Sequence, residues 1–345
     1  VVFLVGGGLV TTYFALDYLS GGEGFIAGFK ILLQKAPEKF DMILEKGQLM
    51  IPDGKGGQKD AYIDLPGISV LVGGMWVANL YYWGCNQYII QRALAAKSLK
   101  EAQSGLVFAA FLKMLLPLIV VIPGIVAFAL SADIAKSDEA YPWLLHNFVP
   151  TGVKGLAFAA LVAAIVSSLA SMMNSVSTIF TMDFYKEYIN KDASEHKLVN
   201  VGRIAAFVAL VIAVFIAPML SNLDQAFQYI QEFTGFVSPG ALAIFLAGFF
   251  YKKATANGAL GAAIGTFAFS LLFKLLLPSL PFMDRMGIVF LICLAIIWIF
   301  AVIEGNKQHA KAITISKELF STGKGFKIGS VIVIILLIIL YTIWW

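Results

Sequence analysis

The chain has 345 residues, of which 59% are apolar and only 13% are charged, and its mean hydropathy is +0.84. Soluble domains carry about 25% charged residues, so this composition excludes an ordinary soluble protein and indicates a polytopic membrane protein. The net charge of +4 forms no basic stripe of the kind that nucleic acid requires. The scattered histidines and the two cysteines, both in apolar segments, predict neither a metal site nor a disulfide framework.

Apolar windows of about 20 residues, the length that crosses a bilayer, predict nine membrane spans. They cover residues 1–20, 67–90, 106–130, 153–182, 199–220, 225–250, 257–279, 285–303 and 326–345. The first window begins directly at Val1, without the charged segment or cleavage site of a signal peptide. We therefore expect the chain to lack its natural N-terminus.

Loop charge predicts the orientation of these spans. The loops at 91–104, 183–203, 251–256 and 304–327 hold or adjoin 14 Lys or Arg residues, whereas the short loops on the other side hold only Lys136, Lys154 and Arg285. Cytoplasmic loops are enriched in Lys and Arg. The first span is therefore predicted to run outward, in the plasma (inner) membrane of the cell, and the C-terminus to lie outside.

The long segment at 21–66 is predicted to lie outside the membrane, because long loops are translocated regardless of their charge. Residues 21–46 show helical periodicity, whereas the stretch IPDGKGGQKDAY is rich in turn residues. We expect one or two amphipathic helices followed by a flexible loop.

Residues 76–92, WVANLYYWGCNQYIIQR, form a bilayer-compatible helix with several polar side chains. Asn79, Tyr82 and Asn86 are spaced i, i+3 and i+7, which predicts two amides and a phenol on one helical face that suits a polyhydroxylated ligand. Gly84 lowers helix propensity there and would free backbone carbonyls. Alternatively, these polar groups only bond packed helices to one another.

The fourth span carries a stripe of small residues, most of which bear oxygen. These are Ala164, Ser167, Ser168, Ser171, Ser175 and Thr178. Such stripes commonly serve close helix packing. The alternative is a sodium site, since two adjacent hydroxyls and a carbonyl one turn earlier supply three oxygens for a hard cation.

Other polar side chains also lie inside spans. Lys113 is deep in the third span and needs an acceptor, a water-filled cavity or neutrality, which favours a functional role. Lys274 lies nearer the end of its span, where we expect it to snorkel to the surface. Gln231 and Glu232 open the sixth span, and they either face a cavity or cap a broken helix.

Proline and glycine predict two interrupted spans. Pro117 and Pro123 should kink the third span, and Pro239 with Gly235 and Gly240 should break the sixth. Transporters place binding sites at discontinuous spans of this kind.

Five segments resemble the sodium/solute symporter family, and most closely its bacterial sodium/galactose branch. They are WVANLYYWGCNQYIIQRALAAKS, FAAFLK, AAIVSSLASMMNS, DFYKEY and FQYIQEFTGFVSPG, and the resemblance follows the whole chain in order. It implies an all-α polytopic membrane fold, leucine-transporter-like, with an inverted repeat of five plus five helices. The first span would be core helix five, the next three would be helices six to eight, and helices one to four would be missing.

The resemblance also implies roles for individual residues. The sugar-binding residues would be Asn79, Tyr82, Lys113 and Gln231. The gates would be formed by Tyr82, Trp83 and Phe227. The sodium site would include Ala164, Ser167 and Ser168. Cys85 departs from the pattern, because the galactose branch has an aromatic residue there.

We therefore predict a single transporter domain over residues 1–345, with an external loop at 21–66, a complete second repeat at 67–250 and additional helices at 251–345. Its function would be sodium-coupled symport of a neutral sugar, galactose or glucose, by alternating access, with no organic cofactor and no catalysis. Alternatives are a symporter of the same family for an amino acid, carboxylate or vitamin, or a transporter-like sensor module. An intramembrane enzyme is disfavoured because HExxH, GxSxG and paired-Asp motifs are missing from the sequence.

Overall fold

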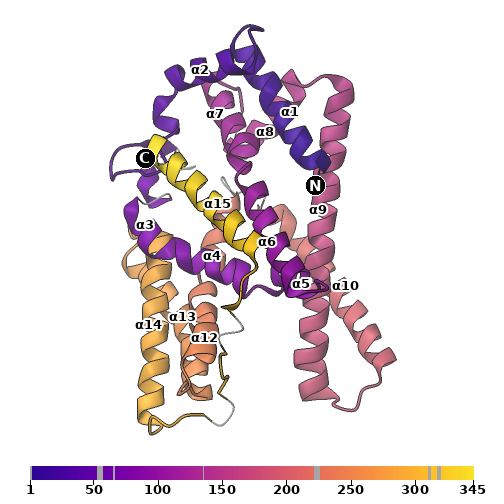
Figure 1. Ribbon diagram of the computed structural model, residues 1–345, viewed down its shortest axis with the longest axis vertical. Helices are drawn as coiled ribbons and strands as arrows, with labels where there is room; N and C mark the ends of the chain where they lie inside the picture. The colour runs from indigo at the N-terminus through magenta and orange to yellow at the C-terminus, as the bar shows by residue number, and fades with distance from the viewer. Residues whose placement is uncertain are drawn as a thin grey trace. The chain divides into compact units, whose positions relative to one another are not determined.

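The computed structural model describes residues 2–52, 57–64, 67–134, 136–220, 226–309, 312–316 and 320–345. Within these ranges the elements are helices, apart from one small antiparallel hairpin (Figure 1). Contacts divide the chain into two compact units, residues 1–40 with 108–226 and residues 41–107 with 227–345. Each unit is described by itself.

The described part contains seven helices that are long and apolar enough to cross a membrane. Two further helix pairs, bent by 81° and 41°, raise the number to nine if each pair forms one span. These seven helices and two pairs correspond to the nine windows predicted from hydropathy. The chain is therefore a multi-pass, all-helical membrane protein.

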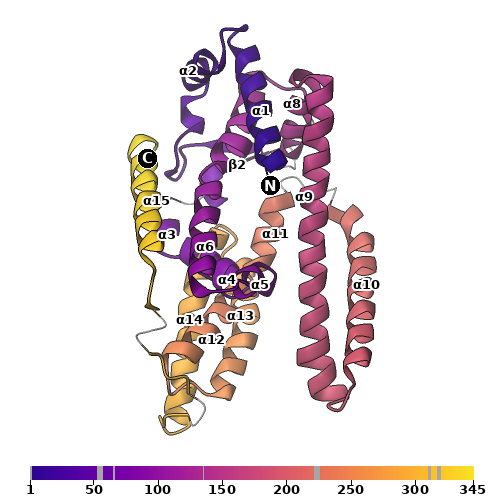
Figure 2. The ribbon, with the colours of Figure 1, turned by 45° about the vertical axis from the view of Figure 1, so that its right-hand side comes forward.

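The first unit is built from the N-terminal helices and the long helices in the middle of the chain. Its elements are α1 (Val2–Leu19), α2 (Phe25–Lys35), η1 (Pro37–Lys39), η3 (Pro117–Val121), α7 (Ile122–Ala129), η4 (Ser137–Glu139), α8 (Ala140–Phe148), α9 (Thr151–Thr178), η5 (Ile179–Ile189) and α10 (Glu195–Leu220). A further helix, α6 (Leu99–Lys113), continues from the second unit into the first. The core brings together Leu16, Leu32, Val126 and Leu144, and α9 and α10 run side by side (Figure 2).

The predicted disturbance at Pro117 and Pro123 takes the form of a π-helical segment, η3. In it, the Ile122 N–H donates to the carbonyl of Pro117 instead of that of Leu118, and Pro123 has no N–H to offer. The carbonyl of Leu118 thus loses its helical donor. The hydroxyl of Thr12 on α1 donates to this carbonyl at 2.6 Å, so α1 satisfies a backbone group that would be costly to leave unpaired in a membrane.

The second unit combines the hairpin, short helices and the C-terminal half of the chain. Its elements are β1 (Met50–Pro52), β2 (Gln58–Asp60), η2 (Ala61–Ile63), α3 (Ile68–Val72), α4 (Gly74–Gly84), α5 (Gln87–Leu94), α11 (Ala226–Thr234), α12 (Ser238–Phe250), α13 (Ala256–Leu276), α14 (Phe282–Ile303) and α15 (Lys324–Ile343). One core cluster packs Val77 of α4 against Leu242 of α12 and Met286 of α14. A second joins α12, α13 and α14 around Ala243, Ala262 and Val289.

The segment at 21–66 agrees with the sequence in one part and differs in another. The predicted amphipathic helix is present as α2, which buries Gly28 and Leu32. The expected flexible loop contains two strands that the sequence did not predict, β1 and β2, which pair antiparallel with Ile51 opposite Lys59. Strands of three residues carry too little alternation to be predicted. Residues 53–56 of the expected loop lie outside the described residues.

Candidate functional site

The helix α4 has one packed face and one open face. Gly74 and Val77 are buried, and Gly74 lies so close to α14 that an added Cβ would stand 1.9 Å from the carbonyl oxygen of Met283. Only glycine fits this contact. On the opposite side of the helix, Asn79 and Trp83 are exposed within the unit, so α4 offers a polar and aromatic surface that its own unit does not cover.

The predicted sugar-binding and gate residues on α4 lie close together. The Asn79 amide donates to the carbonyl of Met75 at 2.9 Å, so one of its donors is used within the helix. The Tyr82 hydroxyl hydrogen-bonds with that of Tyr88. The rings of Tyr82 and Trp83 meet edge to face, with centroids 5.5 Å apart. The aromatic pair is therefore held in a defined geometry.

The predicted weak point at Gly84 is a true helix end. The N–H groups of Cys85 and Asn86 both donate to the carbonyl of Tyr81, and α5 starts only at Gln87. The prediction that Asn86 shares a helical face with Asn79 and Tyr82 is therefore wrong. The Gly84 break ends the periodicity on which that prediction depended.

The sixth predicted span is broken between α11 and α12, as the Gly235, Pro239 and Gly240 pattern predicted, and the two helices meet at 41°. The Thr266 hydroxyl of α13 enters the break, donating to the carbonyl of Phe236 at 3.0 Å and accepting from the Gly240 N–H at 3.2 Å. In an unbroken helix these two backbone groups would bond to each other. The side chain thus replaces one helical hydrogen bond.

An ion cluster adjoins this break. The Glu232 carboxylate of α11 accepts from Arg285 of α14 at 2.8 Å and pairs with Lys274 of α13 at 3.1 Å. Both cations lie over the ring of Phe236. Lys274 is partly exposed, as expected for a lysine that snorkels, but it also has an ionic partner that the sequence did not predict. Arg285 was predicted to be a loop charge, because no spacing signal in the sequence connects it with a carboxylate 53 residues earlier.

The first unit holds the other predicted site residues. Lys113 is the last residue of α6, and Ser167 and Ser168 are exposed on α9, with Ala164 one turn earlier. The Ser171 hydroxyl donates to the carbonyl of Ser167 at 3.1 Å.

Further along the same long helix, the small residues serve packing. Ser175 is buried, and an added Cβ on Gly202 of α10 would stand 2.5 Å from the Ser177 hydroxyl. The stripe is thus buried at Ser175 and exposed at Ser167 and Ser168, while the close contact at Ser177 lies beside it.

The predicted residues fall into two sets. The second unit contains Asn79, Tyr82, Trp83, Phe227 and Gln231, while the first contains Lys113, Ala164, Ser167 and Ser168. The sugar- and sodium-binding roles of all nine stay predictions. In the described ranges, no group of three or more His, Cys, Asp or Glu is arranged to hold a metal ion.

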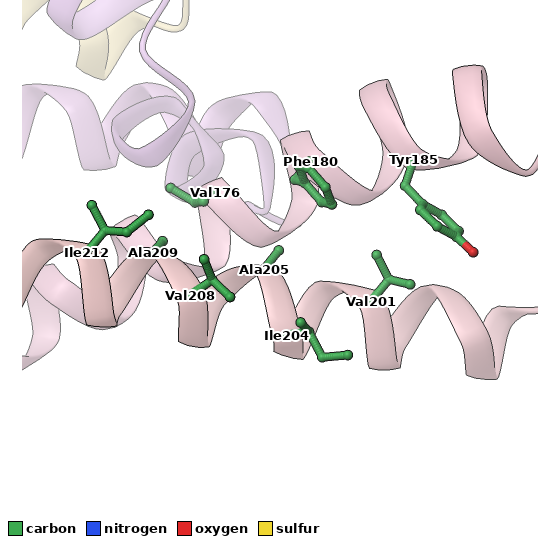
Figure 3. Close-up of a pocket in the computed structure, with 9 residues that line it drawn as sticks. All are labelled: Val176, Phe180, Tyr185, Val201, Ile204, Ala205, Val208, Ala209 and Ile212. Atoms are coloured by element: carbon green, nitrogen blue, oxygen red, sulfur yellow. The ribbon is translucent and has the colours of Figure 1, made fainter.

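A groove of about 440 Å³ runs between the α9–η5 segment and α10 (Figure 3). Its lining is apolar apart from one phenol, and it contains no predicted site residue: Val176, Phe180, Tyr185, Val201, Ile204, Ala205, Val208, Ala209 and Ile212. Such a surface lacks the hydrogen-bonding groups that a sugar or a sodium ion needs.

Known proteins resemble this chain in sequence. Residues 1–265 match the sodium:solute symporter family. The sodium/glucose cotransporter of Vibrio parahaemolyticus is 49% identical over 100% of this chain and 65% of its own length. The human sodium/myo-inositol cotransporter 2 is 38% identical over 57% of this chain and 32% of its own length. The chain thus spans less than two thirds of these relatives.

A solved structure resembles the chain in fold. It is a substrate-bound, outward-open sodium-coupled sialic acid symporter, which aligns with a TM-score of 0.69 at 22% identity and covers 90% of this chain and 61% of its own. This likeness supports the leucine-transporter-like fold with its inverted repeat. The family itself is shown by the match over residues 1–265, which is most of the chain: the chain belongs to the sodium:solute symporter family.

Proposed function

We propose that this chain forms the larger part of a sodium-coupled symporter for a neutral sugar, galactose or glucose, which works by alternating access. The observation that carries the proposal is 49% identity with a sodium/glucose cotransporter along the entire chain. The open face of α4 agrees with it, because an amide and aromatic rings at membrane depth suit the hydroxyls and the apolar face of a pyranose.

In this proposal, Asn79, Lys113 and Gln231 hydrogen-bond the sugar and Tyr82 stacks on its ring. Trp83 and Phe227 belong to the gates on either side. Sodium is the coupling ion, and the Ala164 carbonyl with the Ser167 and Ser168 hydroxyls supplies three neutral oxygens. A sodium ion takes more ligands than three, so other parts of the transporter would complete the site.

Sodium-driven uptake of labelled galactose and glucose, measured with the full gene product in liposomes, tests the proposal. Accumulation should require an inward sodium gradient, and both sugars should compete. Uptake that proline or pantothenate abolishes, while sugars do not, would assign the protein to another solute.

A second candidate is a different neutral polyol, since relatives named as sodium/myo-inositol cotransporters are 37–39% identical over more than half of the chain. Competition by myo-inositol at lower concentration than galactose or glucose would favour it.

A further inference from the structure

The Glu232–Arg285–Lys274 cluster contains a buried cation. The Arg285 side chain is only 5% exposed, and its Nη2 donates to Glu232 Oε1 at 2.8 Å. Lys274 reaches the same oxygen, but its side chain is 42% exposed. Because a buried guanidinium without a partner is costly, Arg285 requires the Glu232 carboxylate, whereas Lys274 has access to other surroundings.

The helix α11 depends on such directed contacts. None of its described residues is buried, so the helix has no core side chain of its own. Backbone hydrogen bonds of residues 235–237 connect its C-terminal end to α12, and its described hydrogen bonds and ion pairs with the rest of the second unit are made by polar side chains. Two side chains four residues apart, on one stripe of the helix, bind the rest of the unit. Gln228 donates to the carbonyl of Asp64 at 3.1 Å, and Glu232 binds Arg285.

The neighbouring stripe carries the candidate site. Phe227 and Gln231 are also four residues apart, and each precedes an anchored residue by one position, which is a rotation of about 100°. The stripe that binds the scaffold therefore sets the direction of the stripe that carries Gln231. A roll of α11 that moved Gln231 would also separate Glu232 from Arg285.

We propose that Glu232 is a positioning residue: its ion pair with buried Arg285 fixes the rotation of α11 and thereby aims Gln231 and Phe227 at the solute. The part of this inference that concerns the solute rests on the proposed function. The part that concerns the rotation of α11 does not.

A double replacement tests the inference in the full gene product. Glu232→Leu with Arg285→Met removes both charges, which avoids an unpaired buried cation and commonly preserves folding, but it also removes the directed contact. Glu232→Gln alone keeps an oxygen acceptor but leaves the charge of buried Arg285 without a carboxylate, and it serves as the destabilised comparison. Lys274→Gln is the matched control, because it keeps the Glu232–Arg285 pair.

The first readout needs no sugar. In a background with Cys85 and Cys293 replaced by alanine, single cysteines at positions 231 and 229, on different sides of α11, are labelled with a polar maleimide. The parent and Lys274→Gln should label one position faster than the other, and the double replacement should bring the two rates toward equality. Unchanged rates in a folded double variant would overturn the proposal.

The second readout is the KM for galactose or glucose, measured with native Gln231 and normalised to the amount of folded protein. Loss of one aligned hydrogen bond predicts a KM about 2- to 10-fold higher, with a melting temperature near that of the parent. An unchanged KM in the double variant would show a purely structural cluster and overturn the aiming of Gln231. If the parent transports neither sugar, but the double variant still labels positions 229 and 231 at equal rates, the sugar proposal fails and the positioning role of Glu232 stands.

Discussion

Two lysines within membrane spans are accommodated differently. Lys274 pairs with a carboxylate on a neighbouring helix. Lys113 is the last residue of α6, four positions before the π-helical segment begins at Pro117, and it lies in the middle of the 31-residue span Leu99–Ala129. A neighbouring carboxylate therefore accounts for Lys274, whereas the role of Lys113 stays with the proposed sugar site.

We expect Lys113→Ala to weaken sugar binding while sodium binding is largely retained. A hydrogen bond to a charged group contributes about 1.5 to 3 kcal/mol, which corresponds to an affinity loss of about 10- to 150-fold. Sugar and sodium affinities of the full gene product provide the measurement. The control is Lys154→Ala, since Lys154 donates to the carbonyl of His146 and belongs to no predicted site. Equal sugar affinity in Lys113→Ala and the parent would remove Lys113 from the site.

For the sodium site, we expect Ser168→Ala to raise the sodium concentration that gives half-maximal transport, without a matching loss of folding. Alanine keeps the small volume and removes one oxygen ligand. Because coupling between ligands is reciprocal, sugar affinity should also become nearly independent of sodium. The ratio of sugar affinities in sodium and in choline measures this coupling.

The packing alternative for the same helix makes a different prediction. Ser175 is buried near the end of α9, so Ser175→Ala should alter stability by about 1 kcal/mol and leave the sodium dependence unchanged. If Ser168→Ala behaves like Ser175→Ala, with the affinity ratio of the parent, Ser168 is a packing residue and no sodium ligand.

At the scale of elements, the break between α11 and α12 depends on one hydroxyl. We expect Thr266→Val to lower the free energy of unfolding by about 1 to 3 kcal/mol, because the isosteric side chain leaves the Phe236 carbonyl and the Gly240 N–H without their partner. Thr266→Ser keeps the hydroxyl and should melt close to the parent. Thermal unfolding in detergent makes the comparison, and equal melting of the Val variant and the parent would contradict this role.

The close contact at the same break explains why glycine is required there. An added Cβ on Gly240 would stand 2.7 Å from the Cβ of Thr266, so the helices approach at backbone distance. This contact places the hydroxyl within the broken hydrogen-bond ladder.

Membrane spans and their breaks were predictable because both depend on local sequence. A window of apolar residues marks a span wherever it packs, and Gly235, Pro239 and Gly84 act on the backbone of their own segment. The Glu232–Arg285 pair and the Thr12–Leu118 hydrogen bond were not predictable, since each joins residues far apart in the chain. Spacing and membrane depth indicated Asn79, Tyr82, Lys113 and the serine pair as candidates but misplaced Asn86, and the family resemblance supplied their specific roles.

At the scale of the whole molecule, we expect an isolated polypeptide of residues 1–345 not to accumulate sugar. The chain covers 61% of the sialic acid symporter and 65% of the sodium/glucose cotransporter, and inverted-repeat transporters build their sites between repeats. The open face of α4 and the hydroxyls of α9 would then each lack a facing wall. Sodium-driven accumulation by purified residues 1–345 in liposomes, compared with the full gene product, would contradict this expectation.

Orientation in the membrane depends on whether the two bent helix pairs cross it. If all nine segments span the membrane, the Lys and Arg content of the loops predicts that the C-terminus lies outside. Arg285 strengthens this prediction, because it is buried in an ion pair and is therefore not a loop charge on the outer side. A C-terminal reporter alone cannot separate nine spans from seven, since both numbers are odd.

A reporter inserted near Lys97 resolves the ambiguity, because that loop follows the first bent pair. We expect alkaline phosphatase to be active at the C-terminus and inactive near Lys97, with a fluorescent protein fusion giving the opposite pattern at both sites. With seven spans the Lys97 loop would be external, and phosphatase inserted there would be active. The Lys and Arg residues of this loop would then lie outside, against the rule that positive loops are cytoplasmic. Active phosphatase at both sites would therefore overturn the nine-span topology, and inactivity at the C-terminus would overturn the predicted orientation.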